Sequence, residues 1–574
     1  MAVREIVRQH LGLLVGGIVL GLLGSAASLA QPVLIGELIK AVSEHTSLVW
    51  PLVSIAALFC ADAGLSASHA YLIGRAGENI VFGMRGVLMS RILRSDMAHF
   101  SRLEHGDVFT RVVTDTSVAR IALTQSVAQI ATSVFTVAGG LALMAWLDWP
   151  LLLLTVGCLG SASAVSLLLA RQVRRAAVGN RTDTSAFGSR VQRVMGAMST
   201  VKASRAEQRE AEDVSAAADA ARRSGIRVSA LSAMLTPAIN VGTQISLAAV
   251  VGWGVARVAT GALPIADLTA FVMYLFYLVA PLALLFLSIG QFQQGRAAMD
   301  RVDELAAIEQ EEPQAPQPAV TRSGPALTFE NVTFGYGDAK GEPALDNVSF
   351  EVPERGLTAI VGPSGAGKTS AFQLIERFYR PQQGTVRLGG ADIGAMPLDQ
   401  IRSLVGYVEQ HNALLRGTVR DNLTYAHPTA DTAAVARAVE FAALADVVIA
   451  LPDGLDTRLG EQGAGLSGGQ QQRLAIARTL LQEPRVVLLD EATAHLDSDA
   501  EARLLDTITA IAEDCAVVAI AHRISTVMAA DHIVVLDGGR VRASGTHAQL
   551  MATDTLYRRL ASQQLSPAPL QAAP

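Results

Sequence analysis

The sequence predicts an all-α six-helix transmembrane domain followed by an α/β P-loop ATPase domain. Three observations predict this fold class. The first half contains six long apolar stretches, the second half alternates short apolar segments with helical ones, and GPSGAGKTS stands at positions 362–370. A chain of 574 residues is long enough for several domains. We place a transmembrane domain at 1–310, a linker at 311–325, the ATPase domain at 326–562 and a disordered tail at 563–574.

The six apolar stretches have the length of membrane spans. A helix needs about 20 apolar residues to cross about 30 Å of hydrocarbon. Five stretches carry no charged residue, and the sixth, 48–74, carries only Asp62. Buried helices of a soluble protein would not account for so many uncharged runs. The predicted spans are 11–36, 48–74, 121–147, 149–170, 228–256 and 268–295.

The positive charges predict the orientation in the lipid bilayer. The loops after spans two and four are rich in arginine, whereas the other connections carry almost none. Cytoplasmic loops hold the excess of Lys and Arg, so both termini and the ATPase domain are expected in the cytoplasm. The four tryptophans lie at the predicted outer ends of spans. The Ala- and Arg-rich composition suggests a bacterial protein and thus a multi-pass protein of the inner membrane.

Asp62 is the one carboxylate inside a predicted span. Ionisable residues within membrane segments are rare and often functional. Two interpretations stay open: contact with a substrate or proton, or a structural role through pairing with another helix or protonation. The overall charge argues against one class of partner. The net charge is −6 and no long basic tract is present, so nucleic acid is not expected to bind.

The phosphate loop follows a short apolar strand at 357–361 and matches the pattern GxxxxGK[ST]. Its glycines let backbone N–H groups surround phosphates, and the next helix presents its positive end to them. Lys368 is expected to reach the β- and γ-phosphates of ATP, and the Thr369 hydroxyl to bind Mg²⁺. The predicted nucleotide contacts of this loop are Gly362, Pro363, Ser364, Gly365, Ala366, Gly367, Lys368, Thr369 and Ser370.

An acidic pair ends a second apolar strand at 486–489. Asp490 is placed to hold Mg²⁺, and Glu491 to orient or deprotonate the attacking water. The alternative is an ordinary strand end, but the order of the two motifs favours the catalytic interpretation.

LSGGQ at 466–470, followed by QQRLAIARTLL, resembles the signature of the ATP-binding cassette (ABC) transporters. Six spans followed by one such domain resemble their exporter-type half-transporters. The resemblance implies that Tyr336 stacks on adenine, Gln410 contacts Mg²⁺ and the attacking water, and His522 contacts the γ-phosphate. It also implies that the signature binds the nucleotide through Ser467, Gly468, Gly469 and Gln470.

Further motifs resemble the same family, with some departures. HGDVFTRVVTD at 105–115 and VKASRAEQREAE at 201–212 resemble coupling regions, and Glu461 resembles an acidic residue found in exporters. Ala494 and His495 stand near Asp497 where Ser-Ala is usual, and Gln471 replaces a common Arg or Lys. Glu409 and His411 also depart from the usual pattern around Gln410. None of these changes removes a ligand of phosphate, magnesium or water.

The family resemblance implies an ATP-driven transporter that works as a pair. In ABC proteins each signature faces the nucleotide of the opposite domain, and this chain has one phosphate loop and one signature. The partner is then a second copy or a homologous half-transporter. The expected activity is export of a small amphipathic solute, drug, lipid or peptide by alternating access. Import of a siderophore-like cargo and an ATP-gated channel or regulatory subunit are the alternatives.

Overall fold

The structure is a computed structural model that describes residues 2–311, 324–337, 343–410, 414–460, 463, 465–491, 498–521 and 523–565. It contains two compact units. The first comprises Met1–Leu93 and Leu103–Ile308, and the second comprises Arg94–Arg102 and Glu309–Pro574.

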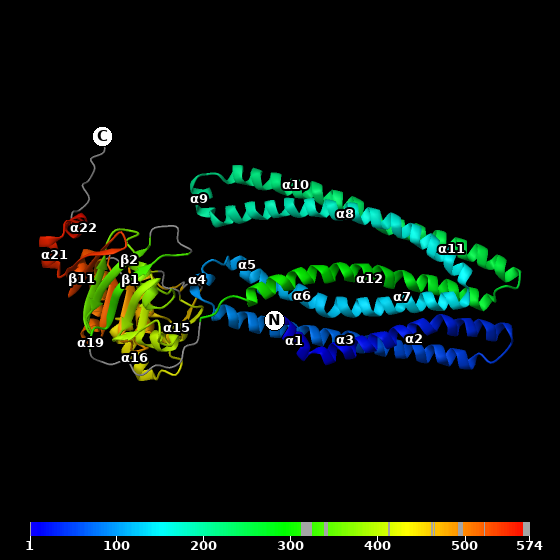
Figure 1. The fold of residues 1–574 in the computed structure, drawn as a ribbon, viewed down its shortest axis with the longest axis horizontal. Helices are drawn as coiled ribbons and strands as arrows, with labels where there is room; N and C mark the ends of the chain where they lie inside the picture. Colours follow the sequence, from blue (N-terminus) through cyan, green and yellow to red (C-terminus); the bar gives the residue numbers. More distant parts are fainter. Residues whose placement is uncertain are drawn as a thin grey trace. The chain divides into compact units, whose positions relative to one another are not determined.

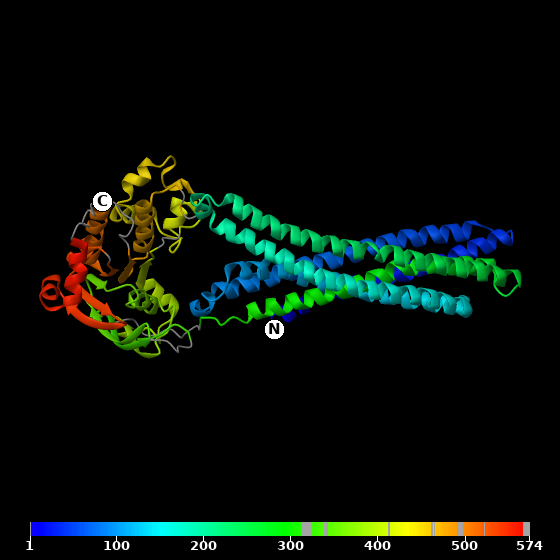
Figure 2. The ribbon, with the colours of Figure 1, turned by 90° about the horizontal axis from the view of Figure 1, so that it is seen from above.

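The first unit is entirely helical. Its main helices pack in antiparallel pairs, of which α2 with α3 and α8 with α10 run side by side in both views (Figures 1 and 2). The helices are α1 (Ala2–Gln9), α2 (Leu11–Ser43), α3 (Val49–Leu93), α5 (His105–Thr110), α6 (Thr116–Ile121), α7 (Val127–Leu147), α8 (Trp149–Gly196), α9 (Met198–Ala203), α10 (Glu207–Ala233), α11 (Leu235–Ala259) and α12 (Ile265–Ala306).

Five helical stretches of the described chain are long and apolar enough to cross a membrane. They are Leu11–Ser43, Val49–Leu93, Gly106–Leu147, Asn240–Ala259 and Ile265–Ala306. The remaining predicted span begins at Trp149, where α8 also begins, and its described apolar stretch, Trp149–Cys158, is shorter. Most of these helices extend well beyond the predicted spans, because Arg- and Glu-rich segments with good helix formers continue them.

Small residues let the helices of this unit approach closely. A Cβ atom built on Gly295 of α12 would lie 2.0 Å from the Cβ of Ala122, and one on Gly140 of α7 would lie 2.6 Å from Leu278. Close backbone approach of this kind holds membrane helices together, since apolar lipid supplies no hydrophobic drive. Two π-helical turns, η1 (Arg111–Asp115) and η2 (Ala122–Ser126), interrupt the α5–α7 helix on the side that packs against α12.

The second unit contains a six-stranded sheet in the order β12-β11-β3-β10-β9-β6 and a four-stranded antiparallel sheet in the order β2-β1-β4-β5. In the six-stranded sheet, only the edge strand β12 is antiparallel to its neighbour. The strands are β1 (Leu327–Phe334), β2 (Leu345–Val352), β3 (Gly356–Val361), β4 (Gln383–Leu388), β5 (Ala391–Asp392), β6 (Val405–Val408), β7 (Gly417–Thr418), β8 (Arg458–Leu459), β9 (Val486–Asp490), β10 (Ala516–Ile520), β11 (His532–Asp537) and β12 (Arg540–Gly545).

The larger sheet is buried on both faces, as expected for parallel strands. Alternate residues enter different cores: Val487 and Leu489 of β9 pack into one apolar cluster, and Val486 and Leu488 into the other. The helices of this unit are α4 (Met97–Phe100), α13 (Lys368–Ile375), α14 (Leu398–Leu404), α15 (Val419–Leu423), α16 (Thr432–Phe441), α17 (Ala445–Ala450), η3 (Gly454–Asp456), α18 (Gly468–Leu480), α19 (Ser498–Asp514), α20 (Ile524–Met528), α21 (His547–Thr553) and α22 (Thr555–Leu565).

The segment Arg94–Arg102 groups with the second unit, although the predicted boundaries placed it in the first domain. The reason is a short backbone ladder. The amide of Asp96 donates to the carbonyl of Glu309 at 3.1 Å, and the amide of Glu311 donates to that of Arg94 at 2.9 Å. The guanidinium of Arg402 then binds both carboxylate oxygens of Glu311, at 3.1 and 2.6 Å. A bidentate pair of this geometry fixes orientation as well as position.

Candidate nucleotide site

The sheet topology brings the predicted catalytic motifs to one edge. β3, β6, β9 and β10 run parallel, so their carboxyl ends lie at the same edge of the sheet. The phosphate loop follows β3, Gln410 follows β6, and Asp490 ends β9 with Glu491 directly after it. Ligands of open α/β sheets bind outside the carboxyl ends of the strands. Segments separated by more than a hundred residues therefore form one candidate site.

Glycines shape the phosphate loop because side chains would collide with neighbouring backbone. A Cβ on Gly362 would lie 2.2 Å from the carbonyl oxygen of Leu536. Gly367 has a φ of +95° and caps the amino end of α13, and its Cβ would lie 2.4 Å from the carbonyl oxygen of Ala344. The loop thus presents its amides and the positive end of α13 to an anion.

The Lys368 side chain is buried under the loop. Its ammonium group donates to the carbonyls of Gly362 and Pro363, each at 2.9 Å. Burial lowers the pKa of Lys368, and the carboxylates of Glu491 and Asp490 oppose that shift. Both carboxylates thus lie close enough to favour the charged ammonium. A cation held between the loop and two carboxylates is positioned to contact phosphate oxygens.

Asp490 is buried at the end of β9, and two hydroxyls approach it. Tyr407 donates to its Oδ2 at 3.4 Å, and the Thr369 side chain also bonds to the carboxylate. Burial raises the pKa of Asp490, and the neighbouring Glu491 raises it further. An ion or a proton is the natural partner for a carboxylate whose charge is disfavoured in this way. The structure therefore brings together Thr369 and Asp490, the two predicted magnesium ligands.

Glu491 has an unusual backbone. Its φ is +48°, a left-handed conformation that L-residues with a side chain rarely adopt. The side-chain amide of Gln410 donates to its Oε2 at 2.6 Å. Strained backbone of this kind gathers at functional sites, where surrounding structure holds it. The contact joins the two side chains predicted to handle the attacking water.

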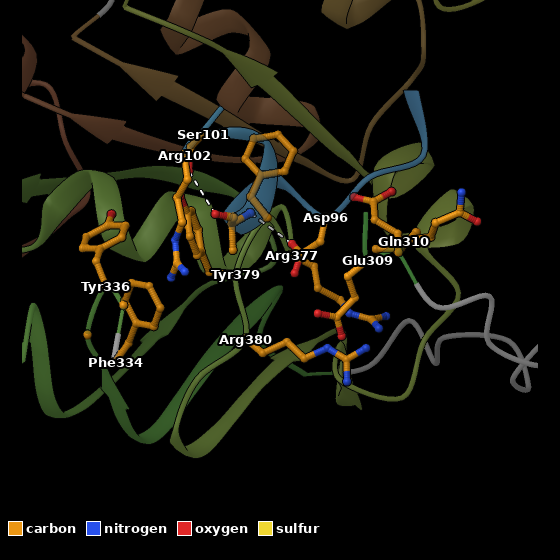
Figure 3. Close-up of a pocket in the computed structure, with 16 residues that line it drawn as sticks. Asp96, Ser101, Arg102, Glu309, Gln310, Phe334, Tyr336, Arg377, Tyr379 and Arg380 are labelled. Carbon is orange, nitrogen blue, oxygen red and sulfur yellow. Dashed lines mark hydrogen bonds between the residues drawn. The ribbon is translucent and has the colours of Figure 1, made fainter. Parts of the chain in front are cut away.

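Tyr336 borders a pocket of about 660 Å³ (Figure 3). Its hydroxyl bonds to Ser370 at 3.0 Å and donates to Gln373 of α13 at 2.5 Å, so the ring is tied to the helix that follows the phosphate loop. Phe334 and Tyr379 meet it edge-on, with ring centroids 4.9 and 5.2 Å away. The ring is about half exposed, leaving surface on which a base could stack.

The same pocket contains residues that the sequence did not point to. Arg377 and Arg380, and Ser101 and Arg102 of the Arg94–Arg102 segment, also line it (Figure 3). The Ser101 and Tyr379 hydroxyls are 3.5 Å apart. No sequence motif marked these side chains, and the ladder between Asp96 and Glu309 brings the Arg94–Arg102 segment to the pocket from a distant part of the chain.

The signature residues form the amino end of α18. The Ser467 hydroxyl accepts from the amide of Gln470 at 3.4 Å, and the Gln470 side chain accepts from the amide of Ser467 at 2.9 Å. This capping box orients the glycine amides of the first turn. Gln471, which departs from the usual Arg or Lys, donates to the carbonyls of Gly463 and Leu466, each at 3.2 Å. Gln471 thus stabilises the loop that precedes the signature.

Of the predicted site residues, the structure thus brings Gln410 to Glu491 and Thr369 to Asp490. The signature residues Ser467 and Gln470 instead bond to each other. Several predicted residues lie outside the described residues. They are His522, Glu461, Asp497, Ala494, His495 and His411.

The family description "ABC transporter transmembrane region" matches residues 14–282, and "ABC transporter" matches residues 345–494. The mitochondrial potassium channel ATP-binding subunit of Homo sapiens is 30% identical over 99% of this chain and 79% of that protein. The chain belongs to the ABC transporter family.

Two further ABC proteins match nearly the whole chain. A multidrug resistance ABC transporter ATP-binding and permease protein of Lactococcus lactis is 28% identical over 96% of this chain and 93% of its own length. A solved structure of a bacterial Atm1-family ABC exporter with ATP bound has a TM-score of 0.80 and 28% identity, covering 98% of this chain and 99% of that one. The chain is thus an ATP-hydrolysing ABC transporter of the exporter type, with several membrane helices.

Proposed function

We propose that this ABC transporter uses ATP hydrolysis to export a small amphipathic solute, drug, lipid or peptide by alternating access. The observation that carries the proposal is the contact between Gln410 and Glu491 at the end of β9. It supplies a water-positioning pair in the same chain as the membrane helices. Closure of the ATPase domains around ATP would then drive the helices from an inward-facing to an outward-facing arrangement.

The proposed chemistry assigns a role to each residue of the site. Glu491 orients or deprotonates the attacking water, and Gln410 holds Glu491 in place. Lys368 and the amides of the phosphate loop neutralise charge on the β- and γ-phosphates. Tyr336 stacks on adenine, and His522 contacts the γ-phosphate.

Mg²⁺ fits the donor set at this edge of the sheet. Hard oxygen ligands suit this ion, and Thr369 and Asp490 place a hydroxyl and a carboxylate together. The side-chain oxygen of Gln410 would complete the protein ligands. When bound, the ion would neutralise the charge that develops on the phosphates during transfer.

A pair of chains is proposed as the working unit. Ser467 and the following amides of one chain would face the nucleotide on the phosphate loop of the other. The family resemblance and the presence of one phosphate loop and one signature per chain support this arrangement. A two-fold axis would then form two equivalent sites. Intact Glu491, Ser467 and His522 favour two copies of this chain over a pair with a degenerate partner.

The proposed location is the inner membrane, with both termini and the ATPase domain in the cytoplasm. Support comes from the arginines that follow spans two and four, since cytoplasmic loops hold such charges. A second candidate function is ATP-dependent regulation of a channel, because one relative carries the name of a channel subunit.

ATP turnover by the purified chain in lipid nanodiscs tests the proposal. We expect steady hydrolysis by the natural sequence and a loss of at least about 100-fold in Glu491→Gln, because the water would lose its base. ATP binding to Glu491→Gln should persist. Near-normal turnover of that variant would remove Glu491 from its role. Turnover without movement of any solute into inside-out vesicles would favour the regulatory function.

A further inference from the structure

A polar cavity of about 610 Å³ lies among the helices of the membrane unit. It is formed by residues of α2, α3, α7 and α12, all of which contain stretches apolar enough to cross a membrane. Its volume is in the range of small-molecule sites. Among the described residues that line it there is no lysine or arginine, and Asp62 is the one carboxylate. The principal polar residues of its wall are Asp62, Ser66, His69, Gln129, Ser133 and Tyr277.

Several of these groups donate hydrogen bonds to other residues of the protein. The Tyr277 hydroxyl donates to Gln31 at 2.7 Å. The Gln129 amide donates to Ser133 at 3.0 Å. His69 Nδ1 lies 2.7 Å from the carbonyl oxygen of Gly17, which can only accept, so in the neutral ring the proton is on Nδ1 and Nε2 is an acceptor.

Two threonines of α7 that line the cavity also donate hydrogen bonds within the protein. Thr132 donates to the carbonyl of Ala128 at 3.1 Å, and Thr136 donates to that of Thr132 at 2.8 Å. A hydroxyl that gives its proton to the backbone keeps only lone pairs for another partner. Tyr277, His69, Thr132 and Thr136 therefore offer lone pairs to a ligand, whereas the hydroxyls of Ser25, Ser66 and Ser133 and the second amide N–H of Gln129 can still donate.

The charge of Asp62 has no counterpart in the described part of the chain. Its carboxylate takes part in no hydrogen bond and no ion pair with any described residue. This observation speaks against structural pairing with another helix, one of the two interpretations that the sequence left open. Gly24 faces the carboxylate, since a Cβ built there would lie 3.4 Å from Asp62 Oδ1. The glycine thereby leaves the space beside the carboxylate open.

We propose that this cavity binds an organic cation that carries several hydrogen-bond donors, such as a protonated amine or amidine, and that Asp62 is its counter-ion. The inference rests on the proposed export function and names the substrate class. A cation with hydrogen-bond donors matches the negative charge of Asp62 and the lone pairs that Tyr277, His69 and the two threonines offer. An anion would meet the carboxylate, and no lysine or arginine among the described lining residues would balance its charge.

The bilayer setting makes the charge match decisive. A carboxylate at the centre of a membrane helix is costly, because lipid does not solvate its charge. A bound cation removes much of that cost, whereas a neutral or anionic ligand does not. Asp62, Ser66 and His69 lie on one face of α3, because residues spaced i, i+4 and i+7 do so. At 1.5 Å per residue, Asp62 and His69 are about 10 Å apart along the helix, so a ligand with donors at both ends could reach both.

Two dyes with one xanthene skeleton provide the test. Rhodamine 123 is a cation with two amino groups, and fluorescein is an anion near neutral pH. Fluorescence anisotropy with nucleotide-free protein in nanodiscs would measure both, with empty nanodiscs as the background. We expect saturable binding of rhodamine 123 at least about tenfold tighter than that of fluorescein. Equal affinities, or no saturable binding of rhodamine 123, would overturn the proposal without requiring any variant.

Variants then assign the charge to Asp62. Asp62→Asn should weaken rhodamine 123 binding by about tenfold or more, and Asp62→Glu, which keeps the charge, should retain most of it. Glu37→Gln is the matched control, because Glu37 is an exposed carboxylate of α2 that does not line the cavity, and it should bind like the natural sequence. Gly24→Leu should also weaken binding by filling the space beside Asp62. Unchanged affinity in Asp62→Asn would overturn the assignment.

The binding test is independent of the proposed pump activity, since no nucleotide is present. Charge-selective binding together with absent ATP turnover would leave the cavity assignment standing and reject the proposed function. Steady turnover together with equal binding of both dyes would support the proposed ATPase activity and reject the cavity assignment.

Discussion

Gln410 offers the most direct residue-scale test of how Glu491 is held. We expect Gln410→Ala to reduce the maximal ATPase rate by about 10- to 100-fold, because general-base catalysis depends on a fixed geometry. The affinity for Mg²⁺-free ATP should change little, since Gln410 bonds to Glu491 and lies after β6, outside the phosphate loop. Steady-state kinetics with a separate ATP-binding titration measures both quantities. A rise in KM with an unchanged rate would show that Gln410 serves binding instead.

Glu376 is a buried carboxyl with an unsatisfied oxygen among the described residues. Burial raises its pKa from 4.5 to about 7, although Arg402 opposes the shift. Between those pH values the folded protein holds a proton that the unfolded chain lacks. Stability contributed by this group is therefore greatest below about pH 4.5 and falls as pH rises toward 7, by on the order of 3 kcal/mol.

Glu376→Gln should remove this pH dependence. We expect the variant to unfold at a higher temperature than the natural sequence at pH 8, with the difference shrinking toward pH 5. Thermal unfolding followed at both pH values measures the effect. A difference that stays the same at pH 5 and pH 8 would show that Glu376 is ionised throughout that range.

At the scale of elements, the packing of α12 against the π-helical turn η2 depends on a missing side chain. A Cβ on Gly295 would collide with Ala122, whereas one on Gly290 of the same helix would meet nothing within 4 Å. Gly295→Val should thus destabilise the membrane unit by about 1–3 kcal/mol, the usual effect of overpacking. Gly290→Val is the matched control and should have a much smaller effect. Thermal unfolding in nanodiscs would compare them, and equal losses would contradict tight packing at Gly295.

Another element-scale feature lies at η1. Asp115 is buried there and binds Arg301 of α12 through both oxygens, at 2.8 and 2.6 Å. Such a pair fixes the register of the two helices, since its two parallel hydrogen bonds allow one geometry. The sequence marked the segment 105–115 only through a family resemblance, and it predicted neither the π-helical turn nor the partner on α12.

At the scale of the whole molecule, the proposed pair can be tested by complementation. Lys368→Ala and Ser467→Arg should each abolish turnover when expressed alone. In a mixed pair, one site combines both defects, and the other combines an intact phosphate loop with an intact signature from the opposite chain. We expect mixed pairs, purified through two different tags, to recover ATPase activity. Pairs of one variant carrying both tags are the control.

Absence of recovery in the mixed pairs would contradict sites shared between chains. If each chain formed its own complete site, every chain in the mixture would carry one defect, and no site would be intact. The experiment therefore distinguishes the two arrangements without needing the identity of the transported solute.

Local patterns determined the broad architecture. Uninterrupted apolar runs leave few alternatives to membrane helices, since each backbone polar group must be satisfied within the span. The motifs GPSGAGKTS, LSGGQ and Asp490-Glu491 carry their chemistry in consecutive residues, so they could be recognised without a fold. The alternation of short apolar strands with helical segments also predicted an α/β domain around the phosphate loop.

Tertiary structure alone decided the rest, because those contacts join residues far apart in the chain. The bond between Gln410 and Glu491, the grouping of Arg94–Arg102 with the ATPase unit, and the strained backbone of Glu491 depend on packing rather than on neighbouring residues. Asp62 shows the division most clearly. The sequence placed a carboxylate within a span, but only the packing of four helices put it in a polar cavity without a partner cation in the described chain.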